Sequence, residues 1–197
     1  MKRIATLLLL TLSLTALPAL AALEVGDVKF DDTAKVGAGD TVINGAGMRK
    51  VLFIKGYAMA LYLPQKAATT TEALAAKGAK RIRLVLLREA SGETFADALA
   101  SGIQKNHGEA EMAALGERIG KLKATMLGIG TVGKGAVIHL DWLPEANGGA
   151  VRLTVNGEKK GEDIAGEDFF RALLRIWLGD KPIQDDLKEQ LLGKRAS

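Results

Sequence analysis

The chain has 197 residues, a formal charge of +4 and 48% hydrophobic residues, and it contains no cysteine. This length suits a single domain, and the composition excludes a mainly disordered chain, because enough apolar surface is present to form a core. The lack of cysteine excludes disulfides, thiolate catalysis, iron–sulfur clusters and cysteine-ligated zinc.

The first 21 residues are typical of a secretory signal peptide. A basic start, Met1-Lys2-Arg3, precedes an apolar run over residues 4–17 and the small-x-small sequence Ala19-Leu20-Ala21. We expect cleavage after Ala21 and a periplasmic or secreted location. The alternative, an uncleaved anchor, is disfavoured because the run is short for a span of about 20 residues. Cleavage removes Lys2 and Arg3 and lowers the formal charge from +4 to +2, so the charge gives little support for nucleic-acid binding.

Residues 22–197 are expected to form one domain that begins with strands. The stretch 23–63 is strand-like and is interrupted by glycines, and its last part, 51–63, is almost continuously apolar up to Pro64. A second strand is predicted over 81–88, where Ile82, Leu84 and Leu86 alternate with other side chains to form an apolar face.

Helices and strands then follow in blocks. Ser91 or Thr94 can cap a first helix, and a second carries an apolar stripe at helical spacing that we expect to pack on the sheet. The stripe consists of Met112, Leu115, Ile119, Leu122 and Met126. A three-strand meander is predicted over 136–143, 151–155 and 160–164, and two helices over 166–178 and 183–192. This order favours an α+β fold.

Most motifs of known chemistry are absent. His107 and His139 lie on different predicted elements, and neither has a second ligand at metal-binding spacing, so no metal site is expected. The glycines of 128–133 have dinucleotide-binding spacing but follow a helix and precede a strand, which indicates a turn and no cofactor. The basic cluster over 80–83 lacks interleaved aromatic residues and predicts a solvated face. No catalytic set is apparent.

One segment, 44–63, combines a glycine turn, Arg49 and both tyrosines of the chain, Tyr57 and Tyr62. A guanidinium offers a planar fork to two carboxylate oxygens, and a tyrosine adds a donor. Together in an apolar cavity, they would suit a carboxylate with an apolar tail. The alternative places Arg49 in solvent and packs the tyrosines at the sheet edge.

The same segment and the end of the chain carry a resemblance to a known family. Gly45-x-Gly47-x-Arg49 and residues 53–63, together with residues 164–193, resemble the chalcone isomerase-like family, in particular its secreted bacterial branch. The resemblance extends from about Asp27 to Gly193. It implies an open-faced β-sandwich, a large antiparallel sheet covered by a layer of helices, with a ligand cleft between them. Plant enzymes of the family close a chalcone ring, whereas other members bind fatty acids through an arginine and a tyrosine.

The resemblance also indicates which of these roles to expect. Arg49 matches the family's arginine, and Tyr57 stands where the enzymes have threonine and the fatty-acid binders have tyrosine. The enzymes' tyrosine, lysine, asparagine and later threonine fall on Phe95, Ala98, Gly102 and Ile176. In the enzymes these polar residues stabilise charge that develops on the substrate, and their positions carry mostly apolar residues in this chain. The resemblance therefore implies binding without catalysis.

We therefore predict that a fatty acid or similar amphipathic carboxylate binds between the sheet and the helices. The predicted binding residues are Arg49, Tyr57, Tyr62, Phe95, Leu99 and Trp177, and further candidates for the tail cavity are Phe53, Met59, Ile103, Phe169 and Leu173. On one straight strand, Arg49 and Tyr57 would lie about 26 Å apart at ~3.3 Å per residue. Joint binding therefore requires a bend, which we place at Gly56, or Tyr62 as the partner of Arg49.

Two alternatives remain open from the sequence. One is an isomerase, an intramolecular lyase acting on a chalcone-like substrate. The other is a structural or partner-binding periplasmic protein with a filled core. No cofactor, no nucleic acid and no membrane span after cleavage are expected, and the sequence identifies no protein partner.

Overall fold

The computed structural model describes residues 22–146 and 148–194, and the predicted signal peptide lies outside these ranges. The fold is α+β, as predicted. The strands are β1 (Leu23–Val25), β2 (Val28–Phe30), β3 (Thr33–Val36), β4 (Gly39–Val51), β5 (Ile54–Leu63), β6 (Lys80–Leu86), β7 (Ala90–Ser91), β8 (Thr131–Val132), β9 (Val137–Leu143), β10 (Ala150–Val155) and β11 (Glu158–Ala165). The helices are α1 (Thr70–Ala75), α2 (Gly92–Lys105), α3 (Glu109–Ile129), α4 (Glu167–Leu178) and α5 (Asp185–Leu191).

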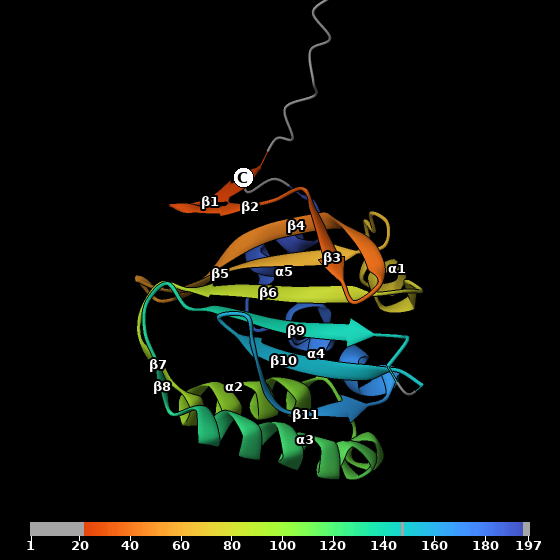
Figure 1. The fold of residues 1–197 in the computed structure, drawn as a ribbon. Coiled ribbons are helices and arrows are strands. Elements are labelled where there is room, and N and C mark those ends of the chain that lie inside the picture. The colour runs from red at the N-terminus through yellow and green to blue at the C-terminus, as the bar shows by residue number, and fades with distance from the viewer. Residues whose placement is uncertain (1–21, 147, 195–197) are drawn as a thin grey trace, which may run out of the picture.

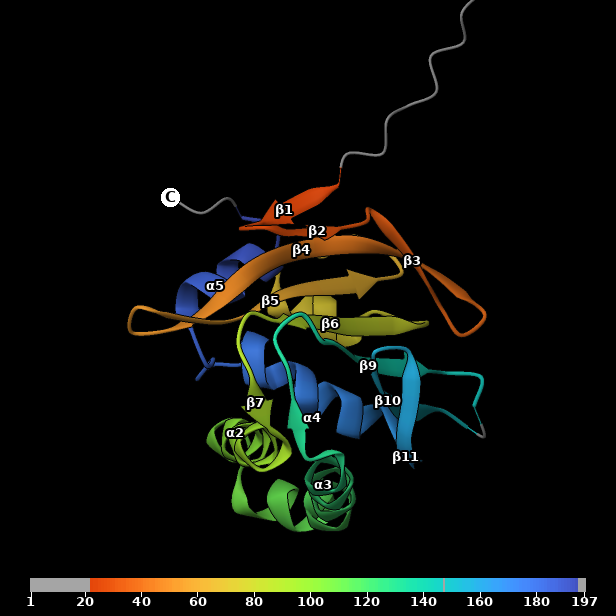
Figure 2. The same cartoon turned by 60° about the vertical axis from the view of Figure 1, so that its left-hand side comes forward.

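A seven-stranded sheet in the order β11-β10-β9-β6-β5-β4-β3 forms the centre of the fold. Every neighbouring pair is antiparallel. Helices α2 to α5 lie on one side of this curled sheet (Figures 1 and 2). This arrangement confirms the predicted large antiparallel sheet with a layer of helices. In the described ranges, no helix is both long and apolar enough to cross a bilayer.

Alternation along β6 separates the two faces of the sheet. Ile82, Leu84 and Leu86 are buried in the main core beneath the helices. The prediction of a solvated basic cluster is wrong for Lys80, because this lysine shares their face and is fully buried. Its Nζ donates to Glu167 Oε1 over 2.9 Å, which ties the start of α4 to the sheet. Because an unpaired charge is costly in a core, this ion pair makes the burial of Lys80 tolerable.

Helix α4 fills the space between the sheet and the outer helices. Its core-facing side chains include Phe169, Leu173 and Trp177, all at most 1% exposed. Helix α2 starts at the predicted cap, Ser91, whose hydroxyl accepts from the Thr94 amide over 3.1 Å. Helix α3 packs on α2 and on β11, the edge strand of the sheet, rather than across the sheet as a whole.

The glycine motif lies within β4 and not in a flexible turn as predicted. A side chain at Gly45 would overlap the backbone oxygen of Gln190, and one at Gly47 would overlap the Gln190 side chain, so both glycines make room for α5. The neighbouring Asn44 is buried. Its Nδ2 donates to Ala67 O over 3.0 Å and to Leu191 O over 2.7 Å, and its Oδ1 accepts from the Ala67 amide over 2.6 Å. This residue joins three distant parts of the chain.

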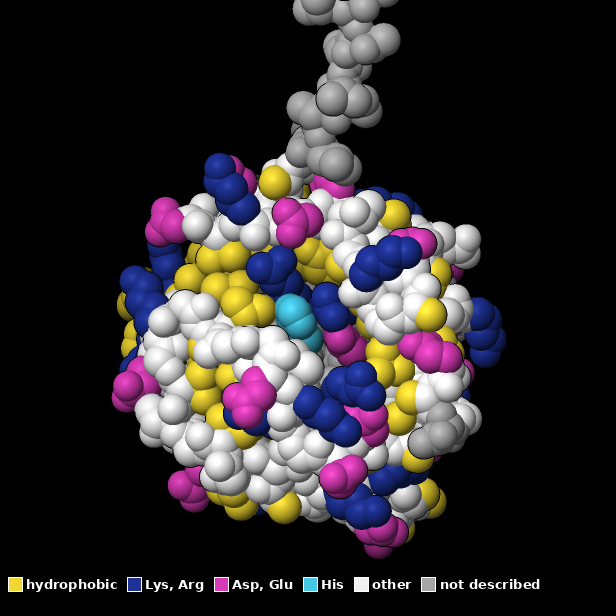
Figure 3. Space-filling model, in the orientation of Figure 1, with side chains coloured by type: hydrophobic (Ala, Val, Ile, Leu, Met, Phe, Trp, Pro, Cys, Tyr) yellow, Lys and Arg dark blue, Asp and Glu magenta, His cyan; other side chains and the backbone are white. Residues whose placement is uncertain are grey.

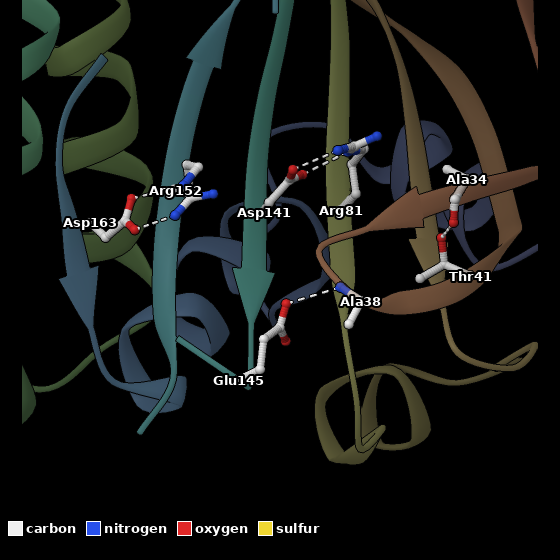
Figure 4. A network of polar contacts seen from close by, with 8 residues as sticks. All are labelled: Ala34, Ala38, Thr41, Arg81, Asp141, Glu145, Arg152 and Asp163. Atoms are coloured by element: carbon white, nitrogen blue, oxygen red, sulfur yellow. Dashed lines mark hydrogen bonds and ion pairs between the residues drawn. The ribbon is translucent and has the colours of Figure 1, made fainter. Parts of the chain in front are cut away.

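The opposite face of the sheet carries charged side chains. Basic and acidic groups gather around a histidine at its centre (Figure 3). Arg81 donates two hydrogen bonds to Asp141, over 2.7 and 2.6 Å, and Arg152 pairs in the same way with Asp163 over 3.0 and 2.6 Å (Figure 4). These bidentate pairs link neighbouring strands. Elsewhere this face is covered by the β1–β2 hairpin, which packs Phe30 among the apolar residues of β4 and β5.

The histidine of this face gives a pH-dependent prediction. Burial, followed by the charges of Arg81 and Arg83, lowers the pKa of His139 from 6.5 to about 4. The unfolded chain therefore takes up this proton near pH 6.5, and the folded chain only near pH 4. The free energy of unfolding should fall as the pH drops through this interval, by on the order of 1–2 kcal/mol after solvent screening. Urea unfolding at pH 7 and at pH ~4.5 measures this fall in the free energy of unfolding, which should be smaller in His139→Gln than in the wild type. Equal losses would exclude this role.

Candidate functional site

A cavity of about 430 Å³ opens between the helical layer and the end of the sheet formed by β4, β5 and β6. Its walls come from the β4–β5 hairpin, the β6–α2 connection and helices α2 and α4. The lining residues are Arg49, Val51, Gly56, Tyr57, Leu86, Arg88, Glu89, Ala90, Ser91, Thr94, Phe95, Ala98, Leu99, Ile176, Trp177 and Ile183. Such a volume suits a small organic ligand.

The β4–β5 hairpin brings Arg49 and Tyr57 together. The stretch 51–63, predicted as one strand, contains a turn at Leu52 and Phe53, so the chain reverses there and not at Gly56. Leu52 adopts the left-handed conformation with φ of 54°. As a result Arg49 pairs directly with Tyr57 across the two strands. Facing residues of an antiparallel pair are about 5 Å apart, so the predicted separation on one straight strand does not apply.

Tyr57 is held by a hydrogen bond from the helical layer. Trp177 Nε1 donates to the Tyr57 hydroxyl over 2.9 Å, and the ring of Phe95 lies with its centroid 6.4 Å from that of Tyr57. Burial raises the pKa of Tyr57 to about 12, despite the opposing effects of the Trp177 hydrogen bond and the Arg49 charge. The hydroxyl therefore keeps its proton at neutral pH. Since Trp177 occupies an acceptor position, that proton is free to point into the cavity.

Arg49 is positioned by Gln184, which lies in the connection between α4 and α5. Arg49 Nη1 donates to Gln184 Oε1 over 3.1 Å and also to the carbonyl oxygen of Lys50. Gln184 in turn accepts from the Lys50 amide over 2.8 Å and donates to Met48 O over 2.9 Å. In the described ranges, no carboxylate forms an ion pair with Arg49. The guanidinium thus retains donors for an anionic ligand.

The structure brings five of the six predicted binding residues to this cavity. Arg49, Tyr57, Phe95, Leu99 and Trp177 all line it. Tyr62 does not, because five residues after Tyr57 its side chain lies on the opposite face, where its hydroxyl donates to Asp31 O over 3.0 Å. Its proposed pairing with Arg49 is therefore wrong.

The further tail-cavity candidates lie elsewhere. Met59, Ile103, Phe169 and Leu173 are packed in the core and do not line the cavity, and Phe53 is 99% exposed. The sequence interpretation missed several lining residues, among them Val51, Arg88, Thr94 and Ile183. Thr94 lies one helical turn before Ala98, which the resemblance aligned with a polar residue of the enzymes, so helical spacing could have indicated it. Val51 reaches the cavity because of the hairpin turn, and Ile183 because of the path of the α4–α5 connection. No local sequence pattern indicates either feature.

Comparison with known proteins identifies the family of this chain. The family model described as chalcone isomerase-like matches residues 22–193. The chain belongs to the chalcone isomerase-like family. A solved structure of a fatty-acid binding protein of Arabidopsis thaliana is similar, with a TM-score of 0.66 and 15% sequence identity over 87% of this chain and 96% of that one. At this identity the likeness concerns the fold. A search of curated proteins found no significant match.

This chalcone isomerase-like chain lines its cavity with apolar groups where the resemblance aligned the enzymes' polar residues. Phe95, Ala98 and Ile176 line it directly. Gly102 lies against Ile176, whose side chain would collide with any Cβ at that position. In the described parts of the chain, no group of three or more histidine, aspartate or glutamate side chains is placed to hold a metal ion. The cavity therefore offers a mainly apolar surface, with the Arg49 guanidinium and the Tyr57 hydroxyl facing each other on one wall and further polar groups, Arg88, Glu89, Ser91 and Thr94, contributed by the β6–α2 connection and the start of α2.

The bond between Trp177 and Tyr57 should contribute to stability. Tyr57→Phe removes the acceptor of a buried indole N–H, so we expect the free energy of unfolding to fall by about 1–3 kcal/mol in urea unfolding. Tyr62→Phe makes the same chemical change, but its partner, the carbonyl of the exposed Asp31, can bind water instead. The free energy of unfolding of this control should fall by less than about 1 kcal/mol. Equal effects of the two substitutions would contradict the assignment.

Proposed function

We propose that this protein binds a fatty acid or a similar amphipathic carboxylate in the cavity, with no catalysed ring closure. The observation that carries the proposal is the pairing of Arg49 with Tyr57 at the edge of an apolar cavity of about 430 Å³. The carboxylate would accept from the Arg49 guanidinium and the Tyr57 hydroxyl, and the chain of the ligand would lie against Phe95, Leu99 and Ile176. Each buried methylene adds about 0.8 kcal/mol of favourable transfer free energy.

Both comparisons support this proposal. The family is chalcone isomerase-like, and the similar Arabidopsis structure is named as a fatty-acid binding protein. The apolar residues Phe95, Ala98 and Ile176 at positions of the enzymes' polar set support the absence of catalysis, because these side chains cannot stabilise charge that develops on a substrate. We also propose that residues 1–21 direct export and are removed after Ala21. An intact mass beginning at Ala22 in periplasmic protein would establish this cleavage.

Native mass spectrometry of protein purified from a bacterial periplasm, followed by organic extraction, tests the proposed binding. We expect a co-purifying carboxylic acid in the wild type and none in Ala98→Trp, whose indole would occupy the cavity. The matched control is Ala113→Trp, on the exposed side of α3 and outside the cavity. A wild type that is free of ligand and unaffected by added long-chain fatty acids would overturn the proposal. Chalcone turnover above the rate in buffer would instead favour the isomerase alternative.

A further inference from the structure

The tip of the β4–β5 hairpin exposes an unusual amount of apolar surface. Val51, Leu52, Phe53 and Ile54 are 52, 87, 99 and 50% exposed. In the part of the chain that the structure describes, only Leu23 and Leu127 are other large hydrophobic side chains with comparable exposure. Single exposed leucines are normal on a protein surface, whereas four consecutive exposed apolar residues at one projecting tip indicate an interaction site.

Folding alone does not account for these residues. Two-residue hairpin turns favour asparagine, aspartate and glycine, which tolerate positive φ. Leu52 instead adopts a φ of 54°, where a leucine is strained relative to glycine. Leu52 and Phe53 also make little contact with the rest of the described chain, since each is at least 87% exposed. The tip therefore combines side chains that disfavour the turn with an apolar surface that no described part of the chain covers.

Basic residues border this apolar tip. Lys50 and Lys55 pair across the two strands directly below it, and both are exposed. Arg49 precedes Lys50 on β4, and no acidic residue occurs between Asp40 and Glu72. Glu89, at the mouth of the cavity, is the one acid among the lining residues and is preceded by Arg88. An apolar tip with a basic border is the pattern of segments that enter the interface of an anionic bilayer.

We propose that residues 51–54 insert into the interface of an anionic lipid bilayer, with Lys50 and Lys55 at the level of the lipid headgroups. The hairpin projects beyond the other strands of the sheet (Figure 2). Val51, the first residue of the tip, and Gly56, two residues after it, also line the cavity. Docking through the tip would thus hold the mouth of the cavity at the membrane surface. If the proposed function is correct, a carboxylate could then pass between bilayer and cavity with little exposure of its tail to water.

Flotation with lipid vesicles tests this docking. Protein purified from a bacterial periplasm is mixed with vesicles of phosphatidylglycerol and phosphatidylcholine in equal amounts. We expect binding by the wild type and a loss of at least about tenfold in the double variant Leu52→Asp, Phe53→Asp. Leu127→Asp is the matched control, since this leucine is 48% exposed on α3, which Figure 2 places away from the tip. This control should bind like the wild type.

Two further measurements distinguish insertion of the tip from adsorption of the protein to the vesicle surface. The emission of Phe53→Trp should shift to the blue with these vesicles and be quenched by brominated lipids, because the new indole would enter the bilayer interface. The wild type, which carries only Trp142 and Trp177, gives the background to subtract. Lys50→Gln with Lys55→Gln should weaken binding to these vesicles more than to pure phosphatidylcholine. The cavity-filled Ala98→Trp should still float, so failure of ligand binding would not affect this result.

The docking proposal is overturned if the wild type does not float with anionic vesicles, or if the double tip variant floats equally well. It is also overturned if Phe53→Trp emission and quenching do not respond to lipid. In that case the tip would be assigned to contact with another protein.

Discussion

Replacing Gly45 with alanine is expected to lower the free energy of unfolding by about 2–4 kcal/mol. The added methyl group would overlap the backbone oxygen of Gln190 and crowd the Leu191 carbonyl, and neither can move without shifting α5 on β4. Urea unfolding of the purified variant measures the loss. Gly47→Ala should lower the free energy of unfolding by less, since the atom nearest to the added methyl group is at the end of the flexible Gln190 side chain.

Gly116 offers a matched control for this substitution. It lies on the exposed side of α3, and a Cβ there would meet no atom within 4 Å. Because alanine has the higher helix propensity, Gly116→Ala should raise stability by about 0.5–1 kcal/mol. The same chemical change thus has opposite expected signs at the two sites. A Gly45→Ala variant as stable as the wild type would show that α5 does not pack closely on β4.

The second large effect is expected on ligand affinity. Arg49→Gln removes the guanidinium and leaves a shorter, uncharged polar side chain. Since a hydrogen bond to a charged group contributes about 1.5–3 kcal/mol, the Kd for a long-chain fatty acid should rise by about 10- to 100-fold. Displacement of a fluorescent fatty acid would measure this change. The Kd for the corresponding methyl ester, which has no carboxylate charge, should change little.

Lys105→Gln controls for the loss of one positive charge, because this lysine is exposed in the last turn of α2 and does not line the cavity. Its affinity for the fatty acid should match that of the wild type. If Arg49→Gln binds the acid as tightly as the wild type does, the carboxylate is held elsewhere, and Arg88 at the mouth of the cavity becomes the next residue to test.

Sequence patterns predicted the sheet and helices where burial alternates regularly. The face of Ile82, Leu84 and Leu86, the helix capped by Ser91 and the α4 core helix all follow from local periodicity and capping. The hairpin turn was missed because Leu52 and Phe53 are not turn-forming residues and continue an apolar run. Helix α1 was also missed, although Thr69 and Glu72 form a capping box at its start.

Other features could not be predicted because they depend on tertiary contacts. Lys80 looks like a surface residue until α4 brings Glu167 to it. Gly45 and Gly47 suggest a flexible turn unless the approach of α5 is known. For the site, residue types and the family resemblance indicated Arg49 and Tyr57, but only the register of β4 on β5 shows that they face each other.

The hydrogen bonds of Asn44 have a consequence for the order of events during folding. Its amide reaches Leu191, 147 residues further along the chain. Closing so large a loop is slow, and strand β4 cannot acquire its full set of partners before residue 191 has left the ribosome. The strands of the seven-stranded sheet all lie within residues 33–165, so the packing of α5 on β4 is the step that depends on the later part of the chain. If residues 1–21 direct export as proposed, a translocation apparatus that accepts only unfolded chains would meet this protein before α5 covers β4.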